Sequence, residues 1–201
     1  MLILARHGRT TANAQRLLLG RMDLPLDDVG LQQADAVGMA LRNCEPVRII
    51  ASPLGRAMET AQAIAAACGV AQVETDERWI EVDYGIFDGE PLAEVPSEVW
   101  QHWRSDPAWT PPNGESLAGV GERVRAACNS LAEAASQGNV VVVSHVSPIK
   151  AAVAWAVGTG DQAAWRLFCD VASISRIRTT GEQPTLVSWN ETAHLLAIEP
   201  A

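Results

Sequence analysis

A short run of side chains near the start of the sequence combines a permanent cation with a nucleophile. Arg6, His7 and Gly8 directly follow the apolar run 2–4, which is typical of a buried strand. In open α/β sheets, ligands bind at the carboxyl ends of the strands. A guanidinium placed there binds oxyanions, and the adjacent imidazole can attack phosphorus or transfer a proton. A strand-end arginine beside a histidine satisfied by local backbone explains the triplet equally well.

Further side chains of this kind stand at or near the ends of expected strands. Arg56 follows the expected strand 47–51 and begins a helix, and His145 follows the expected strand 140–143. Glu81 stands at the start of a segment without clear periodicity. Taken one at a time, each has a simpler explanation. Arg56 could be a surface residue in the first turn of a helix, His145 a capped core histidine, and Glu81 a surface charge. Chance rarely places all of them at strand ends, so we expect one shared site.

The order of the expected elements indicates a three-layer α/β/α sandwich with a mostly parallel central sheet. Strands are expected at 1–5, 47–51, 70–75, 140–143, 172–178 and 185–189, and helices around 31–41, 57–68, 120–131, 148–158 and 161–168. The uninterrupted apolar run 140–143 is typical of the centre of a parallel sheet. The last two strands alternate like antiparallel or edge strands. We expect a single domain, 1–201, with an inserted lid lobe at about 79–116.

Tryptophans dominate the expected lobe. Trp79, Trp100, Trp103 and Trp109 fall within it, out of 7 tryptophans in the chain. They form either an apolar lid that selects a substrate tail or the lobe's own core. The core interpretation is favoured, because a small lobe needs large side chains to bury apolar surface.

Composition excludes several classes of protein. The net charge of −9 and the sequence pI of about 4.9 argue against a nucleic-acid-binding protein, which needs a basic face. Lys150 is the only lysine, so an anionic substrate must be held by local guanidinium groups. The 4 cysteines lack Cys-x-x-Cys spacing and are expected to be structural. No membrane span or secretion signal is expected, so the default is a soluble cytoplasmic protein.

Five short motifs in order resemble those of the histidine phosphatase superfamily, the phosphoglycerate mutase-like group, over nearly the full length. The motifs are Arg6-His7-Gly8 with Asn13, Gly20 with Asp23 and Leu26, Ser52–Ala57 with Thr60, Glu81–Gly85, and Ser144-His145 with Ile149-Lys150. Each motif is short, and their order makes the resemblance specific. It implies a fold of the type expected above, and the departures described below favour the phosphatase branch of this family.

The resemblance also implies a role for each site residue. His7 would attack the phosphoryl group and form a phosphohistidine. Arg6, Arg56 and His145 would surround its non-bridging oxygens. Glu81 would protonate the leaving oxygen and then deprotonate water. Asn13 and Gly20 are expected to bind substrate, and Arg21 and Arg104 to contact a second substrate charge or lie on the surface. No metal and no cofactor are expected.

Two kinds of departure from the family pattern bear on the reaction: missing basic residues and a residue beside the second histidine. Val82 follows Glu81 where the mutases of the family carry an arginine, and Arg104 stands alone where they carry two. We therefore expect a phosphomonoesterase acting on small phosphorylated metabolites, with a mutase or a non-catalytic phospholigand-binding protein as alternatives. Val146 replaces the glycine that usually follows the second histidine, which would reshape the floor of the site.

Three further questions stay open at the level of sequence. Asp83 competes with Glu81 for the role of acid, although local pairing is the favoured interpretation. Ser52 and Ser144 would allow a Ser/His hydrolase, but no Gly-x-Ser-x-Gly elbow is present. The expected partner is a small phosphorylated substrate, with no nucleic acid or membrane. The oligomeric state is open, with a homodimer as one option.

Overall fold

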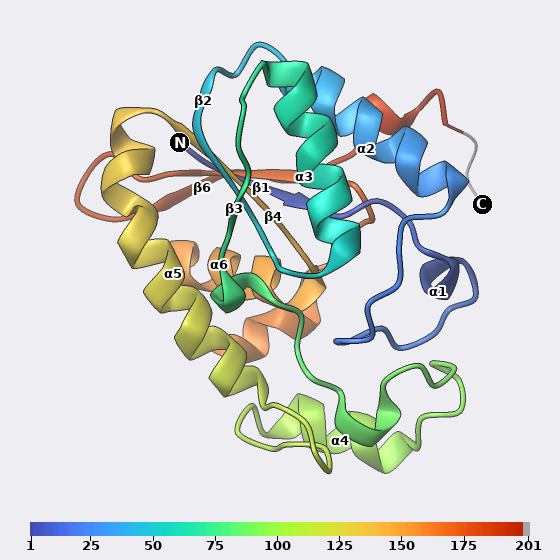
Figure 1. Ribbon diagram of the computed structural model, residues 1–201. Coiled ribbons are helices and arrows are strands. Elements are labelled where there is room, and N and C mark those ends of the chain that lie inside the picture. Colours follow the sequence, from blue (N-terminus) through green and yellow to red (C-terminus); the bar gives the residue numbers. More distant parts are fainter. Residues whose placement is uncertain (199–201) are drawn as a thin grey trace.

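The computed structural model describes residues 1–198, which are built around one six-stranded sheet with the order β3-β2-β4-β1-β5-β6 (Figure 1). Its strands are β1 (Leu2–Arg6), β2 (Pro46–Ala51), β3 (Glu74–Thr75), β4 (Asn139–Ser144), β5 (Ile174–Arg178) and β6 (Thr185–Glu191). The first four of these run parallel, whereas β5 and β6 are antiparallel to their neighbours. The sheet is therefore mostly parallel, with its antiparallel strands at one side, as expected.

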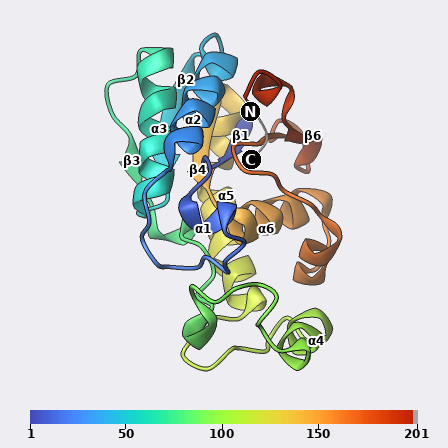
Figure 2. The same ribbon diagram turned by 90° about the vertical axis from the view of Figure 1, so that its right-hand side faces the viewer.

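Helices cover both faces of the sheet, which confirms the expected three-layer α/β/α architecture (Figures 1 and 2). The helices are α1 (Thr11–Ala14), α2 (Asp28–Leu41), α3 (Gly55–Cys68), α4 (Ser97–Ser105), α5 (Leu117–Gln137) and α6 (Val146–Val157). Apolar side chains of α2 and α3 pack on the face formed by Ile3, Ile49 and Val141. Those of α5 and α6 pack on the opposite face, around Leu4 and Val142. Successive strand residues thus point into two different cores.

The central strand β4 explains why three strands share one site edge. All four of its valines, 140–143, are fully buried, and β4 pairs in parallel with both β1 and β2. An apolar run without alternation is what a strand covered on both faces requires. Since the three strands run in the same direction, the residues that follow them lie at the same edge.

The ends of the main helices follow from local sequence. The Asp27 carboxylate caps α2 by accepting a hydrogen bond from the Gly30 N–H at 2.8 Å. Helices α3 and α6 end at Gly69 and Gly158, which adopt left-handed φ angles of 70° and 68°. Glycine adopts this conformation without a Cβ clash, so both stops are encoded directly.

Residues 76–116 carry more regular structure than their weak periodicity indicated. They contain the unexpected helix α4 and the 3-10 turns η1 (Glu77–Trp79) and η2 (Gly85–Phe87). Trp103 of α4 is buried in a small cluster with Leu18 and Val95. Trp79 instead belongs to the main core. Trp79 and Trp103 are thus core residues, and Trp103 also lines, together with Trp100, a second hollow described below. The boundaries of a lobe at 79–116, and of a domain over 1–201, stay predictions, and residues 199–201 lie outside the described part.

Other differences from the sequence expectation are small. The expected strand 70–75 is reduced to β3, and the expected helix at 161–168 is the 3-10 helix η3 (Asp161–Arg166). Helix α1 and the 3-10 turn η4 (Ala193–Leu195) had no clear sequence signal. Within residues 1–198, no helix has the length and apolar character needed to cross a membrane.

Candidate active site

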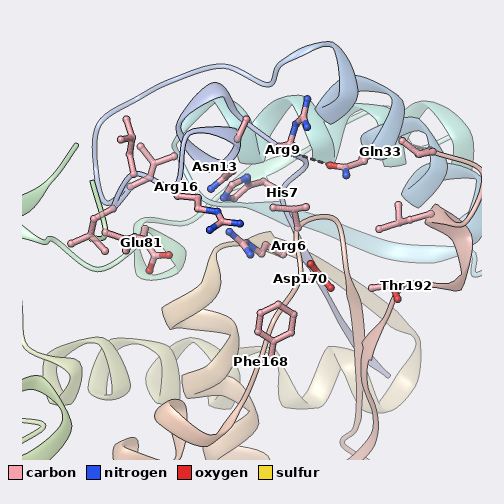
Figure 3. A pocket seen from close by; sticks show the side chains of 18 of the residues that line it. Arg6, His7, Arg9, Asn13, Arg16, Gln33, Glu81, Phe168, Asp170 and Thr192 are labelled. Carbon is pink, nitrogen blue, oxygen red and sulfur yellow. Dashed lines mark hydrogen bonds between the residues drawn. The ribbon is translucent and has the colours of Figure 1, made fainter. Parts of the chain in front are cut away.

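Side chains expected to do chemistry meet at the carboxyl edge of the parallel strands. His7 follows β1, Arg56 lies in the first turn of α3 after β2, and His145 follows β4. Arg6 ends β1, and Glu81 follows the turn η1. In Figure 3, Arg6, His7 and Glu81 surround one cavity. The sheet order β2-β4-β1 therefore brings together residues 50 to 140 positions apart in the sequence.

His7 is a buried, neutral imidazole with one nitrogen left for attack. Its Nδ1 lies 2.7 Å from the carbonyl oxygen of Gly8, which assigns the ring proton to Nδ1 and leaves the Nε2 lone pair free. Burial, with Arg56 and Arg6 nearby, lowers the pKa of His7 well below 6.5. A Cβ at Gly8 would overlap the Gly30 carbonyl group, so only glycine allows this close approach.

Two guanidinium groups are held beside His7 by backbone carbonyls. Arg6 donates from Nη1 to the carbonyl of Cys169 at 2.8 Å. Arg56, which is fully buried, donates to the carbonyls of Met22 at 2.8 Å and Gly20 at 2.7 Å. Burial lowers the pKa of Arg56. These contacts use the terminal nitrogens and orient both guanidinium planes.

His145 faces His7 from the neighbouring strand end. The two ring centroids are 5.0 Å apart, and the His145 Nε2 lies 2.7 Å from the hydroxyl oxygen of Ser52. Ser52 accepts a weak hydrogen bond from the Leu54 N–H at 3.4 Å, so its own proton is available for Nε2. With the Ser52 hydroxyl donating to Nε2, the remaining ring proton of His145 is placed on Nδ1. Burial and the adjacent Arg56 lower the pKa of His145 well below 6.5.

Unpartnered donors concentrate at this site. Within residues 1–198, six buried side-chain polar atoms lack a hydrogen-bond partner, and three of them are Arg6 Nε, Arg56 Nε and His145 Nδ1. Buried polar groups without a partner are uncommon in folded proteins. Three such donors around one nucleophilic nitrogen form a pattern that an oxyanion would satisfy.

Glu81 is buried at the wall of the cavity and is held at one oxygen. Its Oε1 accepts hydrogen bonds from the Val82 N–H at 2.8 Å and the Ser147 N–H at 3.2 Å. Ser147 lies in the first turn of α6, where helical N–H groups are unpaired and favour an anion. Its second carboxylate oxygen accepts no hydrogen bond from residues 1–198, and Figure 3 shows the carboxylate beside the cavity.

Asp83, the alternative acid, is engaged locally. Its carboxylate accepts a hydrogen bond from the Gly85 N–H at 2.8 Å and lies 3.5 Å from Arg21. It does not line the cavity with His7. The geometry therefore favours Glu81 for proton transfer.

Asn13 reaches the cavity with one defined end of its amide. Its Oδ1 accepts from both the backbone N–H and the hydroxyl of Thr10, at 3.1 and 3.0 Å, in a capping box that starts α1. The amide nitrogen is consequently left to donate toward the cavity, which Asn13 lines.

The cavity has a volume of about 1080 Å³ and extends well beyond the catalytic edge. Arg56 and His145 are fully buried and are not among its lining residues, whereas Arg9, Arg16, Gln33, Phe168 and Asp170 line it without having been expected. Figure 3 shows Arg16 next to His7 and Phe168 on the opposite side. The two arginines offered a signal, because they lie within ten residues of His7. Phe168 and Asp170 offered none.

Three residues expected at the substrate lie elsewhere. Gly20 binds Asp88 through its N–H and Arg56 through its carbonyl, and does not line the cavity. Arg21 forms an ion pair with Glu115 at 3.1 Å. Arg104 lies over the ring of Trp165, 5.7 Å from its centroid. The structure does not bring these side chains to His7, and their substrate contacts stay predictions.

The Ser/His pair raised by the sequence exists, but not in a form suited to attack. Ser52 bonds to His145, yet it is fully buried and does not line the cavity. Ser144 donates to the carbonyl of Trp79 at 2.6 Å. A nucleophile must reach its substrate, so the accessible nitrogen of His7 is favoured over either hydroxyl.

Comparisons with known proteins agree with this fold. The family model of the histidine phosphatase superfamily, branch 1, matches residues 2–192. The chain belongs to this superfamily.

Curated relatives carry two kinds of name. A probable phosphoglycerate mutase, GpmB, of Yersinia pestis is 35% identical over 203 residues, which cover 96% of this chain and 93% of the relative. The bifunctional protein Rv2228c of Mycobacterium tuberculosis is 36% identical over 178 residues, which cover 87% of this chain. This chain spans only 49% of that relative's length.

Solved structures of phosphatases superpose closely. Mycobacterial glucosyl-3-phosphoglycerate phosphatase, solved with VO₃, has a TM-score of 0.85 at 28% identity and covers 95% of this chain and 98% of its own. A phosphoserine phosphatase mutant from Entamoeba histolytica, solved with phosphoserine, has a TM-score of 0.88 at 27% identity, with coverage of 97% and 98%. These neighbours support a phosphatase among the activities of the superfamily.

Proposed function

We propose that the protein is a metal-independent phosphomonoesterase that hydrolyses small phosphorylated metabolites through a phosphohistidine at His7. The observation that carries this proposal is the group of unpartnered donors on Arg6, Arg56 and His145 beside a neutral imidazole. A phosphoryl group has three non-bridging oxygens that can accept such donors. The phosphatase neighbours, two of them solved with VO₃ or phosphoserine, add support.

The first chemical step forms the covalent intermediate. The Nε2 lone pair of His7 attacks phosphorus while the bond from phosphorus to the ester oxygen breaks. Glu81 gives its proton to that oxygen, and the alcohol leaves. Because the ring proton is held by the Gly8 carbonyl, the attacking nitrogen is the one that points to the cavity.

The second step restores the enzyme. A water molecule gives a proton to the Glu81 carboxylate as its oxygen attacks phosphorus. The phosphorus–Nε2 bond breaks, inorganic phosphate leaves, and Glu81 is again protonated for the next cycle. The arginines, His145 and the amide of Asn13 supply the charge stabilisation, which is worth roughly 10²–10³-fold per preorganised donor.

The same observations bear on alternatives. The GpmB relative keeps a mutase as the second candidate. Against it, Val82 follows the acid and Arg104 is stacked on Trp165, away from His7. A non-catalytic phospholigand-binding protein is disfavoured because nucleophile, acid and donors are all present.

As part of this proposal we place the protein in the cytoplasm, since its four cysteines carry free thiols. A homodimer stays a prediction.

Phosphate release from a panel of phosphorylated metabolites tests the proposal. His7→Ala should abolish release, and a labelled substrate should leave acid-labile phosphate on His7 of the wild type only. The matched control is His102→Ala, because His102 stacks on Trp109 in the 76–116 segment and does not line the cavity. Normal turnover by His7→Ala, or label on a serine, would show that the mechanism is wrong. Transfer to a second hydroxyl without phosphate release would favour the mutase.

A further inference from the structure

A second hollow, lined by tryptophans, adjoins the catalytic cavity. It has a volume of about 280 Å³, and three residues line both spaces, Leu18, Tyr84 and Leu92. The other lining residues are Trp100, Trp103, Leu117, Val146, Ser147, Lys150, Ala164 and Trp165. Since the two spaces share a wall, a molecule with its phosphate at His7 can extend toward the second one.

The hollow contains one charge, and that charge has no partner. Lys150, the only lysine of the chain, is the only ionised side chain lining the hollow. No carboxylate within residues 1–198 forms an ion pair with it. Burial lowers the pKa of Lys150, and the nearby Glu81 carboxylate, which raises that pKa, offsets only part of the desolvation of the ammonium group. An anion bound beside it would offset that desolvation.

A second donor at the hollow is also unsatisfied. Trp103 is buried, and its indole N–H has no hydrogen-bond acceptor within residues 1–198. Trp100 and Trp165 meet edge to face, with ring centroids 6.3 Å apart, and provide the apolar wall. Aromatic walls often bind cations, but the ammonium of Lys150 would repel one. The hollow therefore combines an apolar wall with one ammonium group suited to an anion.

The position of the hollow relative to Glu81 decides which part of the substrate reaches it. Ser147, whose N–H binds the Glu81 carboxylate at 3.2 Å, lines the hollow, and Lys150 follows one helical turn later on α6. In the proposed reaction the leaving oxygen receives its proton from Glu81, so the leaving group lies on this side of the site.

We infer that the hollow binds the distal end of the leaving group, and that this end is an apolar body carrying a carboxylate that pairs with Lys150. The inference rests on the proposed function for the position of the phosphate. A carboxylate is favoured over a second phosphate because one ammonium balances a single negative charge. The substrate class is accordingly the phosphate monoester of an apolar hydroxy acid.

Two matched series of esters test this substrate class. One is the ω-carboxyalkyl phosphates with three to seven methylenes, and the other is the alkyl phosphates of the same lengths. Wild-type kcat/KM should favour a carboxylated member over its alkyl counterpart by about tenfold or more, as expected for a charge-assisted hydrogen bond. Lys150→Met should bring the ratio of kcat/KM for the two esters close to one. Lys150→Arg should retain a large part of the preference for the carboxylated ester. Val157→Ala, an exposed position on the same helix, should not alter it.

Binding separates this inference from the proposed chemistry. In a His7→Ala background, calorimetry should show the same preference for the carboxylated ester, and Lys150→Met should remove it. Lys150→Gln provides a second variant if Lys150→Met does not fold. If the wild type hydrolyses no member of either ester series, the result counts against the proposed phosphatase activity. The preference in binding for the carboxylated ester then still tests the role of the hollow. Equal affinity for both series, or a preference that survives both Lys150 variants, would overturn the inference.

Discussion

Replacing the Glu81 carboxylate by an amide separates the positioning of this side chain from its proton transfer. In Glu81→Gln, the amide oxygen can accept the same N–H groups of Val82 and Ser147, which hold the present carboxylate at 2.8 and 3.2 Å. Ligand affinity should therefore change by less than about tenfold, because neutral and charged hydrogen bonds differ by only about 1 kcal/mol. An amide, however, is too weak an acid to transfer a proton to a departing alkoxide.

The size of the effect should depend on the leaving group. A positioned general acid contributes roughly 10²–10⁴-fold. Alkoxides need that full contribution, so phosphohistidine formation from an alkyl phosphate should slow by about 10²–10⁴-fold in Glu81→Gln. Nitrophenolate leaves without a proton, and the same step with 4-nitrophenyl phosphate should slow by less than about tenfold.

Single-turnover quench measurements with enzyme in excess isolate the step in question. Steady-state rates would mix it with hydrolysis of the intermediate, which needs Glu81 as a base for both substrates. The matched control is Asp83→Asn, because Asp83 binds the Gly85 N–H and Arg21 outside the cavity. Equal slowing of both substrates in Glu81→Gln would refute the assignment. A leaving-group dependence that appears in Asp83→Asn would transfer the role to that residue.

Other perturbations address the cations, the buried histidines and their support. Arg56→Ala should lower kcat by about 100-fold or more, whereas Arg104→Ala should act on KM or substrate preference; equal kcat losses would contradict this. Burial keeps the pKa of His7 and His145 well below 6.5, so below that pH the unfolded chain binds more protons than the native one. The free energy of unfolding should therefore fall as the pH drops below about 6.5, and urea midpoints should show a smaller fall in His145→Asn. Ser52→Ala removes a bond of 2.7 Å to His145 and should lower kcat about tenfold with KM little changed; an acid-stable phosphate label on the wild type that is lost in Ser52→Ala would instead indicate a Ser52 nucleophile.

The layers of the fold could be predicted from sequence because burial leaves a local pattern. The valine run 140–143 indicated a strand covered on both faces, and Gly69 and Gly158 marked two helix ends. Helix α4 was missed because its apolar residues, Val99, Trp100 and Trp103, extend over little more than one turn. So short a pattern does not distinguish a helix from irregular structure.

The candidate site was predictable in its side chains but not in their supports. The reactive groups follow strands, and parallel strands deliver them to one edge. Ser147 contacts Glu81 through its backbone N–H, a donor that almost every residue type possesses. Ser52 meets His145 across 93 positions of sequence. Neither contact leaves a signal in residue type or spacing, so only the folded chain reveals them.

Asn13 divides one small amide between two tasks, and this restricts how the position can vary. Its oxygen secures the start of α1 through Thr10, and its nitrogen faces the cavity. Aspartate or serine would suit a helix end but cannot offer the amide N–H, while glutamine would carry that donor too far from the backbone. If the proposed mechanism holds, residues that the start of α1 would tolerate at this position would still remove a donor to the phosphoryl group. The four-residue helix α1 therefore fixes the orientation of the Asn13 amide at the cavity.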